Sequence, residues 1–182
     1  LFQFSSMYSR QLAYLALKQY DKVIETGNSA IAFSEEKKIF IGIHVVHAAN
    51  AEAYIFKKDF EKANEIAIKF LEQKQTIVHK YALDTFLKVR AIYLYLSENT
   101  EESLKILEEE YALYKTIEEL SVIGVFNLSF RTFIYEELWM IAEAKELKYE
   151  LDELYKTKNL SIVKKAVDDL INFIKETLNL KY

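Results

Sequence analysis

The chain has 182 residues, of which 51% are hydrophobic and 14% aromatic, with three Gly, no Pro and no Cys. This length suits one domain with an apolar core, and the abundance of Tyr, Phe, Leu and Ile excludes a disordered chain. The lack of Cys excludes disulfides, thiolate metal sites and a Cys nucleophile. Because all-β and doubly wound folds need many Gly and Pro turns, an all-α protein is predicted.

The charge and hydropathy patterns narrow the possible partners. With 24 basic and 28 acidic residues the net charge is −4, whereas a domain that binds nucleic acid on its own usually shows a basic excess. No apolar run approaches the roughly 20 residues of a membrane span, and Leu1 to Arg10 lacks the features of a signal peptide. We therefore expect a cytoplasmic domain with no direct contact to nucleic acid or membrane. The chain begins with Leu1 and not with Met, which fits a piece of a longer protein.

An aromatic residue followed nine positions later by a small or aliphatic residue recurs along the chain. The frame is clearest from Tyr54 to Ala63, and the other occurrences are Tyr14 to Val23, Tyr95 to Leu104 and Phe133 to Ala142. The successive steps are 40, 41 and 38 residues. Such regular spacing indicates tandem repeats, each of which reads as two helices.

Capping residues mark the predicted helices in chain order. Ser34, followed by Glu35 and Glu36, is expected to begin the helix that contains His44 to Phe56. Asp59 is expected to cap a helix from Phe60 to Leu71. Asn99 and Glu102 form a capping-box pattern before Ser103 to Tyr114, and Asn159 or Ser161 is expected to begin the last helix, Ile162 to Leu178.

These elements predict a right-handed α-α superhelix of four helix pairs closed by a C-terminal capping helix. The predicted units of this single domain, 1–182, are 5–34, 35–75, 76–116 and 117–157, with the terminal helix at 160–178. Tyr20, Phe60 and Trp139 are expected to fill the space between successive pairs. Gly27, inside a helical stretch, is explained by the close approach of a neighbouring helix.

The segment Ala51-Glu-Ala-Tyr54-Ile-Phe-Lys-Lys-Asp59-Phe60-Glu-Lys-Ala63 resembles a tetratricopeptide repeat, and the resemblance extends from about Ser5 to Leu151. The chain departs from that family in its longer period and in the absence of the closing Pro. The small residue expected three positions before each aromatic is kept only at Ala51; the other three positions hold Gln11, Ile92 and Phe130.

Long, Pro-free repeats of this kind resemble the C-terminal domains of the PlcR-like and Rgg-like (RRNPP) regulators of Gram-positive bacteria. The resemblance implies a quorum-sensing function, in which the repeats bind a short peptide and a DNA-binding domain, absent from this chain, precedes them. It also implies a homodimer. Asn residues on the first helices of the repeats would contact the peptide backbone.

Six residues on predicted first helices form the candidate peptide site: Asn50, Glu52, Arg90, Tyr93, Asn127 and Arg131. An Asn amide can both donate to and accept from a peptide backbone, and a guanidinium can pair with a carboxylate. Lys88 adds positive charge near Tyr93. The alternative for each of these residues is an ordinary solvated face or a contact that holds the helices together.

Other chemistries lack the residues they need. The Lys and Asn clamp of chaperone-binding repeats is absent, because the corresponding positions hold Tyr8, Leu12, Ala48, Glu52, Val89 and Tyr93. His44 and His47 lack a third metal ligand, and the carboxylates at 108–110 and 136–137 lack an accompanying nucleophile. We therefore expect neither an enzyme nor a cofactor. A constitutive scaffold that docks a folded protein, without a small ligand, remains the alternative function.

Overall fold

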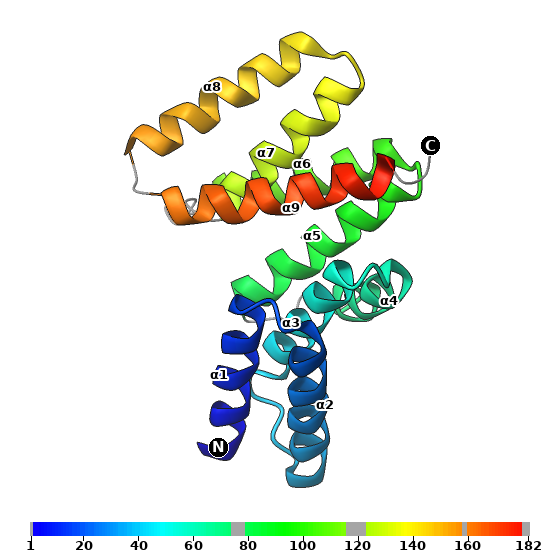
Figure 1. Cartoon of the computed structure of the whole chain (residues 1–182), viewed down its shortest axis with the longest axis vertical. Helices are drawn as coiled ribbons and strands as arrows, with labels where there is room; N and C mark the ends of the chain where they lie inside the picture. Colours follow the sequence, from blue (N-terminus) through cyan, green and yellow to red (C-terminus); the bar gives the residue numbers. More distant parts are fainter. Residues whose placement is uncertain (1, 74–78, 116–122, 158–159, 180–182) are drawn as a thin grey trace. The chain divides into compact units, whose positions relative to one another are not determined.

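The computed structural model describes residues 2–73, 79–115, 123–157 and 160–179, and all the regular structure in these ranges is helical, which confirms the all-α prediction (Figure 1). The helices are α1 (Phe2–Ala16), α2 (Tyr20–Lys37), α3 (Ile43–Phe56), α4 (Phe60–Leu71), α5 (Lys80–Leu96), α6 (Thr100–Lys115), α7 (Ile123–Glu137), α8 (Ile141–Thr157) and α9 (Ser161–Asn179). The chain packs as two compact units, Leu1–Tyr93 and Leu94–Tyr182, which divide inside α5. They are called the N-terminal and the C-terminal unit below.

Four short turns between consecutive helices share one backbone geometry. Each contains a residue in the left-handed region, with φ between 56° and 64°: Lys18, Lys58, Glu98 and Trp139. The next amide donates to a carbonyl five residues earlier, at 2.9–3.0 Å, in the pairs Gln19–Tyr14, Asp59–Tyr54, Asn99–Leu94 and Met140–Tyr135. This bond belongs to the Schellman motif that ends many helices. The turns recur after 40, 40 and 41 residues, so the period of about 40 residues is confirmed.

The turns also fix the register of the repeat. Four residues after the residue whose amide donates that bond lies a small buried side chain, namely Val23, Ala63, Ser103 and Ala144 in the four turns. The predicted frame is therefore correct for the first two turns, and it is wrong by one residue in the third and by two in the fourth. In the third turn, Leu94 occupies the position that holds Tyr in the other turns. The predicted frame therefore began one residue late, at Tyr95.

One predicted helix cap is confirmed and another is wrong. The Asp59 side chain accepts a hydrogen bond from the Lys62 amide at 3.2 Å, and α4 begins directly after it. Ser34 does not begin a helix: it is buried in the last turn of α2, where its hydroxyl donates to the Ile39 carbonyl. Gly42, at φ +80°, precedes α3 instead, because a left-handed backbone suits Gly. The predicted unit limits at 75–76 and 116–117 and the predicted cap Asn159 lie outside the described residues.

Helix α3 is the centre of the N-terminal unit. It packs against α1, α2 and α4, and its Ala residues at 48, 49, 51 and 53 are fully buried. Small side chains let the neighbouring helix backbones approach closely. The Phe70 and Phe86 rings stack at 5.0 Å between α4 and α5, and Tyr20 stacks on Phe56 at 4.9 Å, so Tyr20 fills the space between α2 and α3 as predicted.

Helix α7 has the same central place in the C-terminal unit, where it packs against α6, α8 and α9. Its core is aromatic: the rings of Phe126, Phe130 and Phe133 follow one another along α7, and Tyr95 meets the last two edge-on. The terminal helix contributes the buried face Val167, Leu170, Ile171 and Ile174. Trp139, in contrast, is 85% exposed at the α7–α8 turn, so the prediction that it fills a gap between helix pairs is wrong.

Candidate functional site

The six candidate residues lie on three helices. Asn50 and Glu52 are on α3, Arg90 and Tyr93 are on α5, and Asn127 and Arg131 are on α7. The first four belong to the N-terminal unit and the last two to the C-terminal unit. Each unit is therefore described by itself.

Asn50 is a buried packing residue, in agreement with the alternative that it holds the helices together. Its side chain is 2% exposed; its Oδ1 accepts from Gln11 Nε2 at 2.9 Å, and its Nδ2 donates to Asn28 Oδ1 at 3.3 Å. Gln11 Nε2 also donates to the Val46 carbonyl at 3.1 Å. These amides join α1, α2 and α3.

Gly27 makes room for this amide cluster. A Cβ atom at Gly27 would lie 2.2 Å from Asn50 Oδ1 and 2.4 Å from Gln11 Nε2, far inside van der Waals contact. The prediction that Gly27 reflects the close approach of a neighbouring helix is thus confirmed. Gly27 is tolerated within α2 because its missing side chain leaves space for two hydrogen-bonded amides.

Asn127 is also buried, with no exposed surface, in agreement with the same alternative. Its Nδ2 donates to the Leu107 carbonyl and to Glu110 Oε2, both at 2.7 Å. Glu110 is 1% exposed on α6. Both hydrogens of the Asn127 amide are thereby used between α7 and α6.

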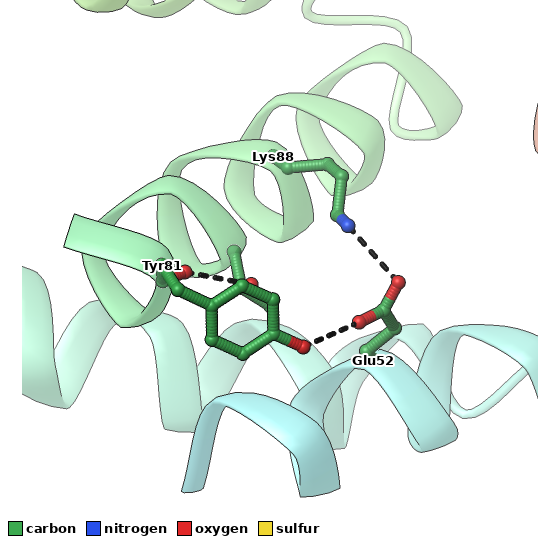
Figure 2. Close-up of polar contacts among 4 residues, drawn as sticks. Glu52, Tyr81 and Lys88 are labelled. Atoms are coloured by element: carbon green, nitrogen blue, oxygen red, sulfur yellow. Dashed lines mark hydrogen bonds and ion pairs between the residues drawn. The ribbon is translucent and has the colours of Figure 1, made fainter. Parts of the chain in front are cut away.

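Glu52 belongs to a half-buried charged cluster with two residues of α5 (Figure 2). One carboxylate oxygen lies 3.0 Å from Lys88 Nζ, and the other accepts from the Tyr81 hydroxyl at 3.3 Å. The Glu52 and Lys88 side chains are 18% and 13% exposed. The pKa of Tyr81 is raised above its ordinary value, first by burial and then by the negative charge of Glu52. Tyr81 therefore stays neutral, and its hydroxyl donates a hydrogen bond to the Glu52 carboxylate.

The Glu52 cluster offers a carboxylate and an ammonium group side by side at the edge of the protein surface. Such a pair can exchange its internal partners for the charged groups or the backbone of a ligand. Tyr81 was missed by the sequence analysis. Tyr81 and Lys88 are seven residues apart and so share a face of α5, but nothing in the sequence pairs that face with Glu52.

Arg90 holds α5 to α4. Its Nη1 donates to Asn64 Oδ1 at 2.8 Å, and its guanidinium carbon lies 5.8 Å from the centre of the Tyr93 ring. Asn64 is buried, and Arg90 and Tyr93 are both half-buried. The structure therefore joins Arg90 and Tyr93 to each other, in an arrangement that agrees with the helix-joining alternative.

Arg131 lies in an aromatic and acidic cluster of the C-terminal unit. Its guanidinium carbon is 5.9 Å from the Tyr111 ring centre and 6.0 Å from that of Tyr135, and its Nη2 is 3.3 Å from Glu108 Oε1. Tyr135 donates to the same Glu108 oxygen at 3.0 Å. The Arg131 side chain is only 12% exposed. Cation–π contacts and ion pairing together fix the guanidinium among α6 and α7.

Tyr111 extends this cluster to α8, because its hydroxyl donates to the Glu150 carboxylate. The pKa of Tyr111 is raised by burial and by this hydrogen bond, and lowered to a smaller extent by Arg131. The sequence analysis named Arg131 but missed its aromatic partners. The four-residue spacing of Arg131 and Tyr135 was a usable signal, because such residues are neighbours on a helix.

The two neighbouring histidines pack on one ring. His44 lies 5.4 Å from the Phe70 ring, edge-on, and His47 lies 4.6 Å from it. Burial, with the nearby positive charge of Lys69 and His44, lowers the pKa of His47 to about 4. Within the described ranges, no group of three or more His, Cys, Asp or Glu side chains is arranged to hold a metal ion.

The hydropathy of the helices and the comparisons with known proteins complete the description. None of the helices in the described part of the chain combines the length and the apolarity that a membrane span requires. Comparisons with protein families, with curated proteins and with solved structures found no significant match to this chain. Any functional conclusion therefore rests on the geometry described above.

Proposed function

We propose that this chain is a peptide-binding sensor domain of a transcription regulator, with a quorum-sensing role and with the DNA-binding part outside this chain. In this proposal the helices form a right-handed superhelix of four pairs closed by α9. The protein is cytoplasmic and dimeric, and it binds a short peptide along the first helices of the pairs. Peptide binding then changes the arrangement of those helices, which passes the signal to the DNA-binding part.

The observation that carries the proposal is the fourfold recurrence of one turn after 40, 40 and 41 residues. Identical turns join α1 to α2, α3 to α4, α5 to α6 and α7 to α8. Tandem helix pairs of this kind place their first helices in a row and so offer an extended binding surface. All six candidate residues lie on such first helices.

Within the N-terminal unit, the Glu52–Tyr81–Lys88 cluster is the best-supported contact for a peptide. Asn50 is fully engaged in packing, whereas Glu52 and Lys88 keep part of their surface exposed and have opposite charges. In the proposal, Lys88 binds a peptide carboxylate or carbonyl while Glu52 accepts from a peptide N–H or ammonium group. The internal ion pair keeps both side chains in place until the ligand arrives.

A charge exchange tests the site. Short peptides of randomised sequence are incubated with the protein, and those retained after gel filtration are identified by mass spectrometry. We expect Lys88→Met to reduce binding of the retained peptides about 10-fold, which corresponds to about 1.4 kcal/mol. The double variant Glu52→Lys with Lys88→Glu rebuilds the ion pair with reversed polarity but leaves the Tyr81 hydroxyl without its carboxylate acceptor. It should therefore melt only slightly below the parent but retain different peptides.

The exposed pair Lys62–Glu65 on α4 supplies the control, because Lys62→Met removes the same charge from a solvent-exposed pair on a helix that contributes no residue to the cluster. We expect this variant to bind like the parent. A double variant that melts normally and retains the same peptides as the parent would contradict the proposed site, and would leave the pair a structural feature.

The scaffold alternative has one specific observation in its favour, the exposed aromatic side chains of the C-terminal unit. Trp139 and Tyr149 are 85% and 68% exposed. Large exposed apolar side chains are typical of surfaces that dock other proteins. Under this alternative, the peptide experiment retains no peptide on any variant.

A further inference from the structure

The fourth turn differs in chemistry from the three turns that share its backbone. The left-handed position holds Lys18, Lys58 and Glu98 in the first three turns but Trp139 in the fourth. A bulky side chain in this region is rare, because its Cβ crowds the following carbonyl. Trp139 therefore stands in a conformation that polar residues or Gly adopt more easily, and its ring is 85% exposed.

Trp139 is the centre of an apolar tip, which we define as Leu138, Trp139 and Ile141. The exposed fractions of Leu138 and Ile141 are 46% and 58%. Contiguous exposed apolar side chains mark interaction surfaces, and Trp is the residue type most enriched at the energetic centres of interfaces. The tip thus has the composition of a protein-interaction surface.

The charges beside the tip are negative. From Glu136 to Glu143 the chain contains three carboxylates and no cation, and Glu136 pairs with Lys148 of α8. A partner surface for the tip must therefore be apolar at its centre and positively charged at its rim.

The N-terminal unit carries a surface hollow with these properties. It has a volume of about 370 Å³ and is lined by Lys18, Gln19, Tyr20, Asp21, Lys22 and Lys57. Asp21 is neutralised by its ion pair with Lys57. Tyr20, whose ring stacks on Phe56, is the aromatic residue of this lining. We call this feature the basic hollow.

We propose that the apolar tip of one copy of this chain docks in the basic hollow of a second copy. The hollow is large enough for an indole ring, which would lie against Tyr20, while Glu137 and Glu143 would face Lys18 and Lys22. The contact joins two different surfaces, the tip of one copy and the hollow of the other. This contact is independent of the proposed peptide function and of the two-fold dimer implied by the family resemblance.

The chain has a built-in probe for this contact, because Trp139 is its single Trp. Tryptophan emission and sedimentation are followed from low micromolar to millimolar protein. We expect the emission to be that of a solvent-exposed indole at low concentration and to shift to shorter wavelength as the mass rises. Trp139→Gly, which suits the left-handed backbone, and Lys22→Glu should each weaken this association at least 10-fold. Lys105→Glu, the same charge change on the exposed face of α6, should not weaken it.

Mixing the variants identifies the geometry. Trp139→Gly keeps the hollow and Lys22→Glu keeps the tip, so their mixture should form a one-to-one complex in which the Trp139 emission shifts, at a concentration at which each variant alone stays monomeric. Association of the parent without an emission shift overturns the proposal, as does a mixture that fails to associate. Emission that is already blue-shifted at the lowest concentration and unchanged on dilution also overturns it, because the tip is then covered without a second copy.

Discussion

The buried amides of Asn50 and Asn127 show how two units built from similar helix pairs solve one packing problem differently. In the N-terminal unit, Asn50 meets two neutral amides, and Gly27 provides the space for them. In the C-terminal unit, Asn127 donates to a backbone carbonyl and to the Glu110 carboxyl group. The first solution depends on the space that Gly27 leaves, and the second on a carboxyl group that α6 brings into the core. Both show that an Asn on a first helix can belong to the core and not to a groove.

The largest expected effect comes from removing the space in the N-terminal unit. In an exposed helix Gly→Ala stabilises by about 1 kcal/mol. We expect Gly27→Ala to destabilise instead, by about 2–3 kcal/mol, because the new methyl group must displace buried, hydrogen-bonded amides. Urea unfolding measures the change.

Ser29→Ala on the exposed face of the same helix is the matched control, and it should be neutral or slightly stabilising. If Gly27→Ala were as stable as the parent, the amide cluster would have to be loosely packed, and the contrast between the two units would disappear.

Removing each amide tests the contrast directly. We expect Asn127→Ala to destabilise by about 2 kcal/mol, because the buried Glu110 carboxyl group and the Leu107 carbonyl both lose a donor. Asn50→Ala should cost about 1 kcal/mol, because Gln11 Nε2 keeps its bond to the Val46 carbonyl. Chemical unfolding of the two variants beside the parent gives both values, and the reverse order would contradict the comparison.

The outcome of the individual predictions shows where sequence reasoning succeeds and where it stops. Asp59, Gly27 and the period of about 40 residues were predictable, because caps, missing side chains and spacing are local properties. The burial of Asn50 was not, because it depends on Gln11 and Asn28, which reach it from two other helices. The same holds for Tyr81, whose partner Glu52 lies 29 residues away. Residue types indicate what a side chain can bind, and the packing of helices decides whether that capacity is already used.

The histidines offer a way to perturb one unit alone, because all three are in the N-terminal unit. The pKa of folded His47 is about 4, below the 6.5 of the unfolded chain, so the unfolded state binds more protons as the pH falls through this range. The stabilisation is complete above pH 6.5 and is lost towards pH 4. After allowance for the partial exposure of His47, we expect a loss of about 1 kcal/mol between pH 6.5 and pH 5.

Amide hydrogen exchange, measured separately in α3 and in α7, follows this loss. After correction for the intrinsic pH dependence of amide exchange, the protection of α3 amides should fall between pH 6.5 and pH 5. The protection of α7 amides should change little. His47→Gln should remove the difference. Equal acceleration in both helices would mean that the two units unfold together and that neither can be perturbed alone.

The smallest expected effect concerns the turns, which the two units share. A side chain in the left-handed region costs about 1–2 kcal/mol relative to Gly, and Gly loses about 0.5–1 kcal/mol through the greater freedom of the unfolded chain. Trp139→Gly in the C-terminal unit and Lys58→Gly in the N-terminal unit should therefore each stabilise by about 0.5 kcal/mol, because an 85% exposed indole contributes little to the core. Paired urea unfolding curves at a concentration low enough to keep the parent monomeric measure both. If Lys58→Gly stabilises while Trp139→Gly destabilises, then the indole packs on its own chain, and the fourth turn is part of the core of the C-terminal unit and not a surface kept for a partner.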